Sequence, residues 1–234
     1  MRTLKKSGRA LLPNRLTWID ETNRGDHWYL EDGDRCLFFG EYFAGMSYRG
    51  GDTNQLIFNF KCPPSTAAMN IGRGNWKIRA INEISAAIRS AVGKKNAEEL
   101  TWVPVPPSKA VGHADYDDRL SRTLEKAFLG FDADVRLLLR QTTSTKSDHD
   151  SQERLTPEEL LAITELNRDA LNSRPIGRGI VLFDDVLASG KHFKCCEARL
   201  RDVVPADTPI IGVFVARSVR PNPFDDFDDL SEQM

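Results

Sequence analysis

The sequence lacks the patterns that mark several large protein classes. Its four cysteines form no C-x-x-C pair, so we expect neither a zinc site nor a disulfide framework. No apolar run is long enough to span a membrane, and the basic N-terminus is not followed by the apolar stretch of a secretory signal. A formal net charge of −2 does not indicate a protein that coats nucleic acid. We therefore expect a cytoplasmic protein with free thiols and no membrane partner.

From residue 100 onward, strand patterns alternate with helical patterns. The expected strands lie at 101–107, 134–141, 178–185 and 208–219, and the expected helices at 115–131, 157–167 and 191–202. Strands that read as continuous apolar runs are typical of a parallel sheet covered on both faces. The sequence therefore predicts an α/β fold, with an open parallel sheet and helices on both of its faces.

The first 98 residues are less regular, and we expect them to form an α+β appendage or hood. Two short strands are expected around the turn at residues 31–34, and a helix at 75–95, where apolar residues recur at helical spacing up to Gly93. The apolar run at 53–64 fits a strand or a helix, because its periodicity does not decide between them. The expected division is an appendage at 1–98, a core at 99–220 and an acidic tail at 221–234.

The stretch IVLFDDVLASGKH, residues 180–192, holds the most informative pattern. Asp184 and Asp185 follow a buried strand, and ligands of open parallel sheets bind beyond the carboxyl ends of the strands. Carboxylates accept hydrogen bonds from ribose hydroxyls, while N–H groups of a tight turn before a helix bind anions, helped here by Ser189 and Lys191. The sequence thus predicts a sugar-phosphate site. The alternative is a strand that ends at the surface, with Asp185 capping the turn.

This stretch resembles the ribose-phosphate signature of the type I phosphoribosyltransferases, in which an apolar strand, two acidic residues, two aliphatic residues and a small turn follow one another. The corresponding residues are Asp184 and Asp185, then Val186 and Leu187, then Ala188, Ser189 and Gly190. His192 stands where the family carries threonine or serine. The order of WVPVPPSK, YDDRL and VRLLLRQTTSTK is similar to the competence-associated ComF-type branch, although its cysteine-rich zinc element is missing here.

The resemblance implies that the substrate is 5-phosphoribosyl-1-pyrophosphate, with Mg²⁺ bound mainly through the pyrophosphate. It implies that Asp184 and Asp185 bind the ribose and that residues 186–192, including Lys191 and His192, surround the 5′-phosphate. Pro107, Ser108 and Lys109 are then the expected pyrophosphate loop, and Lys146 lies on a loop at 141–154 that closes over the reaction centre. The alternatives are a proline-stiffened connector for the first segment and a plain surface loop for the second.

Three functions stay open on these residues. The first is a phosphoribosyltransferase that transfers the sugar phosphate to an unidentified acceptor, expected to be a nitrogenous base. The second is a sensor on the same fold that binds phosphoribosyl pyrophosphate or a nucleotide without turning it over. The third is a ComF-like protein of DNA uptake, with a nucleic acid or a protein as its partner. A homodimer is compatible with each of them.

Overall fold

The computed structural model describes residues 11–145 and 155–220, and its centre is a six-stranded sheet in the order β1-β2-β8-β7-β3-β4. Only the edge strand β1 is antiparallel to its neighbour, and the other strands pair in parallel. The strands are β1 (Thr17–Trp18), β2 (Arg35–Phe43), β3 (Thr101–Pro104), β4 (Asp134–Val135), β7 (Ile180–Leu187) and β8 (Ile210–Val219). A separate antiparallel pair consists of β5 (Leu139–Gln141) and β6 (Thr164–Leu166).

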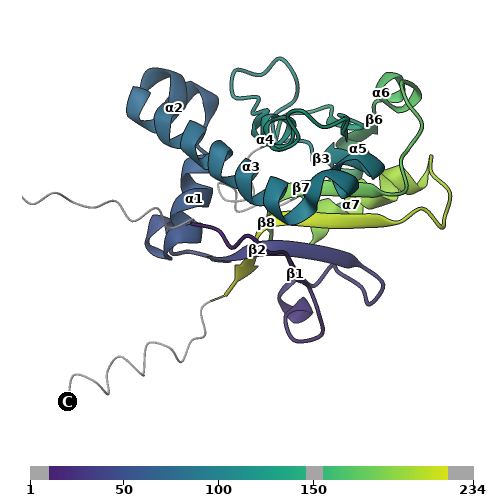
Figure 1. Cartoon of the computed structure of the whole chain (residues 1–234), viewed down its shortest axis with the longest axis horizontal. Helices are drawn as coiled ribbons and strands as arrows, with labels where there is room; N and C mark the ends of the chain where they lie inside the picture. The colour runs from purple at the N-terminus through teal and green to yellow at the C-terminus, as the bar shows by residue number, and fades with distance from the viewer. Residues whose placement is uncertain (1–10, 146–154, 221–234) are drawn as a thin grey trace, which may run out of the picture.

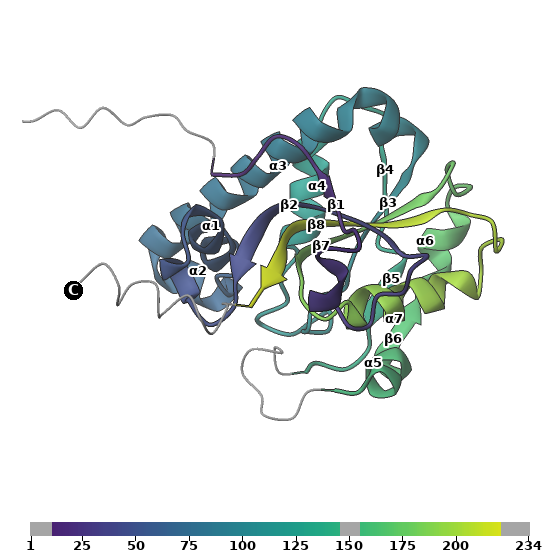
Figure 2. The ribbon, with the colours of Figure 1, turned by 90° about the horizontal axis from the view of Figure 1, so that it is seen from below.

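Helices cover both faces of the six-stranded sheet, which confirms the α/β class. Figure 2 shows α3 (Ile71–Glu99) and α4 (Arg119–Ala127) on one side and α7 (Lys191–Arg201) on the other. The shorter helices are α1 (Asp52–Phe60), α2 (Pro64–Met69), α5 (Pro157–Ile163) and α6 (Arg168–Asn172), with 3-10 turns η1 (Arg24–Asp26) and η2 (Ser47–Arg49). Among the described residues, no helix is long and apolar enough to cross a membrane.

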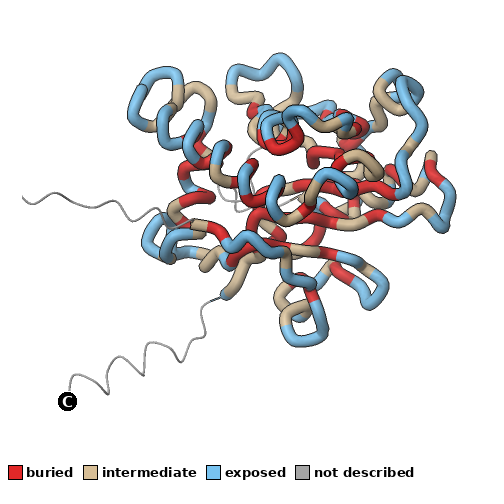
Figure 3. Tube along the Cα trace, viewed as in Figure 1, coloured by how far each residue is buried: buried red, intermediate tan, exposed pale blue. Residues whose placement is uncertain are grey.

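The central strands are apolar throughout because they are buried from both sides. Ile180 to Phe183 of β7 are all buried, and Figure 3 shows the buried chain concentrated in the middle of the sheet. The chain runs from β3 outward to β4 and then returns to β7 and β8 on the opposite side of β3. The order therefore reverses between β3 and β7, and such a switch point is where open α/β sheets bind ligands.

Strands from both sides of the expected boundary at residue 98 belong to this one sheet. β2 pairs with β8 along most of its length, from Arg35 opposite Ile211 to Phe43 opposite Val219. A single cluster of buried apolar residues includes Phe38, Ile84 and Phe183. The first 98 residues thus share the core of the later ones, and the expected tail at 221–234 lies outside the described residues.

The structure contradicts two local expectations and decides a third. Residues 28–30 form a turn, so only the second of the two strands expected around 31–34 is present, as β2. The run at 53–64, left open between strand and helix, contains α1, with Leu56, Ile57 and Phe60 on its buried side. Residues 134–141 split into β4 and β5, because the buried guanidinium of Arg136 binds Asp134 and the carbonyl of Arg174 where the chain turns.

The helix expected to end at Gly93 bends there and continues to Glu99. Gly93 has a φ of 70°, which ends one helical segment, and a second segment follows directly. The expected elements at 101–107, 115–131, 191–202 and 208–219 contain β3, α4, α7 and β8. The helix expected at 157–167 is correct only up to Ile163, as α5, because residues 164–166 form β6 and pair with β5.

Candidate functional site

Asp184 and Asp185 lie at the switch point, at the carboxyl ends of β3 and β7. The last backbone contact between these strands is the Val105 N–H, which donates to the Phe183 carbonyl at 2.9 Å. Toward β8 the pairing continues through Val186 and Leu187, opposite Ala216 and Arg217. The expectation that the strand ends at Asp185 is therefore correct toward β3 and wrong toward β8, where β7 reaches Leu187.

The two carboxylates point to opposite faces of β7, because successive side chains of a strand alternate. Asp185 faces the side of α1 and α4 and is only 4% exposed. Its carboxylate pairs with Lys61 Nζ at 3.0 Å and with the guanidinium of Arg119. Burial opposes ionisation of Asp185, but the charges of Lys61 and Arg119 outweigh it and lower its pKa.

Asp184 is the less buried of the two residues, and its carboxyl accepts a hydrogen bond from the Asp185 N–H at 2.7 Å. Burial and the neighbouring charge of Asp185 raise its pKa to about 7. Its charge also adds to the burial that raises the pKa of the Cys196 thiol of α7. At neutral pH the site therefore combines one firmly ionised carboxylate with one carboxyl that readily takes up a proton.

A row of alternating charges extends from Asp185 into the protein. Arg119 also pairs with Asp117 at 2.9 Å, and Asp117 pairs with Lys77 Nζ at 2.6 Å. We call Lys61, Asp185, Arg119, Asp117 and Lys77 the charge chain. Asp117 and Arg119 stand at the start of α4, where charged side chains are usually solvated, yet Asp117 is only 8% exposed. Lys61 and Lys77 were not identified from the sequence, because their partners are distant in the chain.

The turn at residues 186–190 has the geometry of an anion site. Gly190, with a φ of 87°, precedes the first residue of α7, a helix of eleven residues. Within the described residues, the N–H groups of Ala188, Ser189 and Gly190 have no acceptor, while the Lys191 N–H donates to Ser189 Oγ at 3.4 Å. Free N–H groups in front of a helix N-terminus favour a bound anion.

Residues 27–30 form hydrogen bonds with the backbone of this turn, a role that the sequence did not predict. The His27 Nδ1–H donates to the Ala188 carbonyl, and the Tyr29 N–H donates to the Ser189 carbonyl at 3.0 Å. His27 is fully buried, and burial lowers its pKa. A Cβ atom at Gly190 would lie 2.9 Å from Leu30 Cδ2, so a side chain at this position conflicts with the supporting segment.

Two lysines of the expected site hold the chain on either side of residues 146–154. Lys109 Nζ donates to the Thr145 carbonyl at 2.6 Å, and Lys191 Nζ donates to the Leu155 carbonyl at 2.7 Å. The Thr145 N–H also donates to the Ser108 carbonyl at 2.8 Å. The expected pyrophosphate loop and the helix start after the turn at 186–190 thus contact the two residues that flank this segment, while Lys146 itself lies outside the described residues. His192 is exposed beside the turn.

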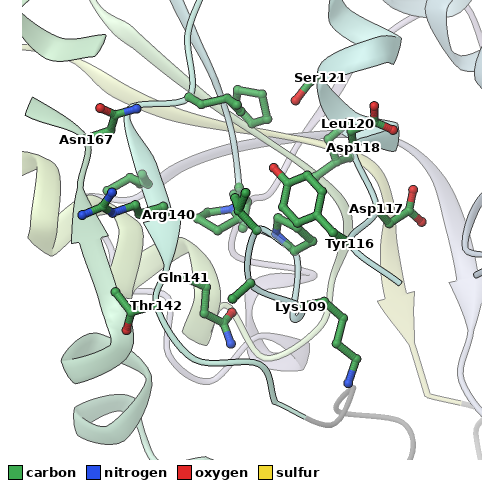
Figure 4. Close-up of a pocket in the computed structure, with 18 residues that line it drawn as sticks. Lys109, Tyr116, Asp117, Asp118, Leu120, Ser121, Arg140, Gln141, Thr142 and Asn167 are labelled. Carbon is green, nitrogen blue, oxygen red and sulfur yellow. The ribbon is translucent and has the colours of Figure 1, made fainter. Parts of the chain in front are cut away.

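A cavity of about 430 Å³ lies at the same edge of the sheet, on the β5 side of β3. Pro106, Pro107 and Lys109 line it, but Asp184, Asp185 and the turn at 186–190 do not. Figure 4 shows Tyr116 on one side of the cavity and Gln141 on the other. The structure thus places the expected pyrophosphate loop between the cavity and the aspartates.

The acidic residues do not form a metal cage. In the part of the chain that the structure describes, no group of three histidine, cysteine or acidic side chains could hold a metal ion. All four cysteines are buried free thiols. Because Mg²⁺ takes few protein ligands and often relies on substrate phosphates, the residues at this edge fit a magnesium that arrives with a phosphorylated substrate.

Comparison with known proteins does not assign the chain to a family. No protein-family model matches the chain, and no curated protein matches it. The resemblance of residues 180–192 to a family signature therefore rests on those residues and on their positions in the fold.

Proposed function

We propose that this protein is a phosphoribosyltransferase-like enzyme that binds 5-phosphoribosyl-1-pyrophosphate together with Mg²⁺. The observation that carries the proposal is the pairing of a phosphate-binding turn with two carboxyls at one switch point. The order β4-β3-β7-β8 matches the first four strands of the doubly wound order 2-1-3-4-5, with β3 as its first strand, which supports ligand binding at the switch point between β3 and β7. Lys61, at the end of α1, adds a cation from the first 98 residues to this edge of the sheet.

The groups at the carboxyl ends of β3 and β7 each have a role in this proposal. The N–H groups of Ala188, Ser189 and Gly190 bind the 5′-phosphate, as the free donors of this turn suggest. Asp184 hydrogen-bonds a ribose hydroxyl, and its pKa of about 7 lets the carboxyl donate or accept. Lys109 lies on the loop after β3, where it would compensate the charge of the pyrophosphate. When bound, Mg²⁺ adds positive charge to the same leaving group.

The proposed reaction is a substitution at the anomeric carbon. A nitrogen of the acceptor forms the new C–N bond, while the C–O bond to pyrophosphate breaks and pyrophosphate leaves with the electron pair. Positive charge develops on the ribose, and a closed loop that excludes water protects it from hydrolysis. The contacts of Lys109 with the Thr145 carbonyl and of Lys191 with the Leu155 carbonyl hold residues 145 and 155 beside this edge of the sheet.

One observation favours a sensor as the second candidate. The Asp185 carboxylate is already engaged by Lys61 and Arg119, so it is less available to a ribose hydroxyl than a free carboxylate is. A protein with one available carboxyl would bind the sugar phosphate without the full set of contacts that transfer needs.

Measuring pyrophosphate release from phosphoribosyl pyrophosphate and Mg²⁺, with a panel of purine and pyrimidine bases, tests the proposal. We expect base-dependent release, reduced at least about tenfold in Lys109→Met, the scale of one lost charge contact at the leaving group. The matched control, Lys126→Met on the exposed face of α4, should keep the wild-type rate. Saturable binding without release for any base would establish the sensor instead, and absence of binding to folded protein would reject both.

A further inference from the structure

A row of aromatic rings and arginines covers the protein around α1 and the start of α3. The Tyr48 and Phe58 rings are 5.8 Å apart, and both side chains are exposed. The guanidinium of Arg49 lies 6.0 Å from the Tyr48 ring, and that of Arg73 lies 4.4 Å from the Phe58 ring. We call these four side chains the aromatic–arginine cluster. Cation–π attraction holds these guanidinium groups near the rings, so the cluster presents positive charge and apolar ring surface side by side.

The cations of this cluster have no carboxylate partner among the described residues. Arg73 donates only to the Asn59 amide oxygen, at 3.3 Å. Most other described arginines form an ion pair with a carboxylate, as Arg119, Arg136 and Arg217 do. In the sequence between residues 44 and 82, Asp52 is the one acidic residue against five basic ones. Lys61 and Lys77 are paired within the charge chain. Arg49, Arg73 and Arg79 remain against Asp52, so this end of the molecule carries a net positive charge.

Apolar side chains next to the cluster are exposed as well. Met69 is 82% exposed, Ile71 80% and Trp76 50%, and the guanidinium of Arg79 lies 4.8 Å from the Trp76 ring. Trp76 follows Arg73 by three residues, so the two share one face of α3. The surface thus offers both positive charge and apolar contact area.

The last described strand ends beside this surface. The Ala44 N–H donates to the Val219 carbonyl at 3.0 Å, and Figures 1 and 2 show the end of β8 at the same end of the molecule as α1 and α2. Tyr48 is four residues beyond Ala44, within about 14 Å, and Asp225 is six residues beyond Val219, which span up to about 20 Å when extended. Residues after Arg220 can therefore reach the cluster.

Residues 221–234 have the matching chemistry. They contain five carboxylates and no lysine or arginine, and Phe224, Phe227 and Leu230 alternate with the acidic residues. We propose that the segment 224–232 of this chain docks on the aromatic–arginine cluster, with its carboxylates on Arg49 and Arg73 and its apolar side chains on the exposed rings. Because the segment is tethered next to the cluster, a high effective concentration favours this contact over ligands from solution. The docked segment then protects the cluster from other anionic partners. This inference does not depend on the proposed enzymatic function.

A labelled peptide of residues 221–234 tests the docking by fluorescence anisotropy on full-length chains. In one chain Asp225, Asp226, Asp228 and Asp229 are replaced by asparagine, which weakens its own segment. We expect this chain to bind the peptide at least about tenfold more tightly than the wild type, whose own segment competes. Adding Arg49→Gln and Arg73→Gln to it should reduce peptide binding by a similar factor. Arg168→Gln, an exposed arginine of α6, is the matched control and should change nothing.

Equal peptide binding by the wild-type and asparagine chains would overturn the proposal, as would binding that is insensitive to the two cluster substitutions. An oligothymidylate is the competing occupant, because its bases stack on aromatic rings and its phosphates bind arginine. Oligonucleotide binding by the asparagine chain alone supports docking. Equally tight binding by the wild type shows an open cluster and contradicts it.

Discussion

Asp184 and Asp185 are neighbours in the chain, yet their carboxyl groups lie in opposite electrostatic surroundings on the two faces of β7. On the α4 face, Asp185 is enclosed by Lys61 and Arg119 and belongs to a chain of paired charges. On the α7 face, Asp184 has a backbone N–H as its hydrogen-bond donor, and its pKa is raised to about 7. Adjacent carboxyl groups of one motif therefore differ: Asp185 is held in ion pairs, whereas Asp184 is not.

The difference follows from the alternation of side chains along a strand. A strand that ends between two helical layers gives one carboxylate to each layer. The layer with α1 and α4 supplies cations, whereas the layer with α7 supplies a helix N-terminus and backbone N–H groups. Charge is thus compensated on one face, and anion-binding groups are left available on the other.

Replacing the two aspartates separately should show this contrast most strongly. Asp185→Asn leaves Lys61 and Arg119 without their shared carboxylate, and breaking a buried ion pair in this way costs about 3–5 kcal/mol of stability. Asp184→Asn, which replaces a carboxyl that resists ionisation, should cost less than about 1 kcal/mol at pH 7. Urea unfolding of both variants measures the difference. Equal losses would show that both faces compensate charge alike.

Glycine substitutions test whether residues 27–30 fix the conformation of the turn at 186–190. Gly190 and Gly130 both have a positive φ, but only a Cβ at Gly190 meets another residue, Leu30. Gly190→Ala should therefore cost about 1–3 kcal/mol more than Gly130→Ala, the usual penalty of overpacking. Thermal unfolding of the two variants, and of Gly190→Ala with Leu30→Ala, provides the measurement. A double variant no more stable than Gly190→Ala would mean that the clash is not the cause.

The free energy of unfolding should change with pH because Asp184 titrates. Its pKa is about 7 in the folded state against an ordinary 3.8, so its protonated form stabilises the fold at low pH. This contribution is lost as the pH rises through 7, on the order of 1 kcal/mol between pH 6 and pH 8. The lowered pKa of His27 acts in the opposite direction, with stability gained as the pH rises through 6.5. Unfolding curves of the wild type and of Asp184→Asn separate the two, because only the wild type should show the Asp184 loss.

The part of the fold that local patterns determine could be predicted from the sequence. β7 and β8 are continuous apolar runs, and the turn before α7 is marked by Ser189 and Gly190, so the edge with the aspartates was found. The segment at 28–30 looks like a strand, but its backbone binds the turn at 188–189, which no local pattern encodes.

The charge chain could not be predicted for a similar reason. Lys61 follows an apolar helix and Lys77 lies within a long one, and each carboxylate partner is remote in sequence. A lysine buried on the apolar face of a helix is a signal of a hidden partner, but it does not say which carboxylate provides it. The split of residues 134–141 likewise depends on carbonyls far along the chain that bind Arg136.

Calorimetric titration of phosphoribosyl pyrophosphate with Mg²⁺ into the wild type, Ser189→Ala and Ser189→Asp tests the central claim most directly. The aspartate adds negative charge where the 5′-phosphate is proposed to bind, yet it is favourable before a helix N-terminus, so the fold should be retained. We predict saturable binding to the wild type and to Ser189→Ala, and at least about a hundredfold loss in Ser189→Asp, the scale of a lost charge-assisted contact plus repulsion. Absence of binding to the folded wild type, or equal binding by Ser189→Asp, would contradict the sugar-phosphate site.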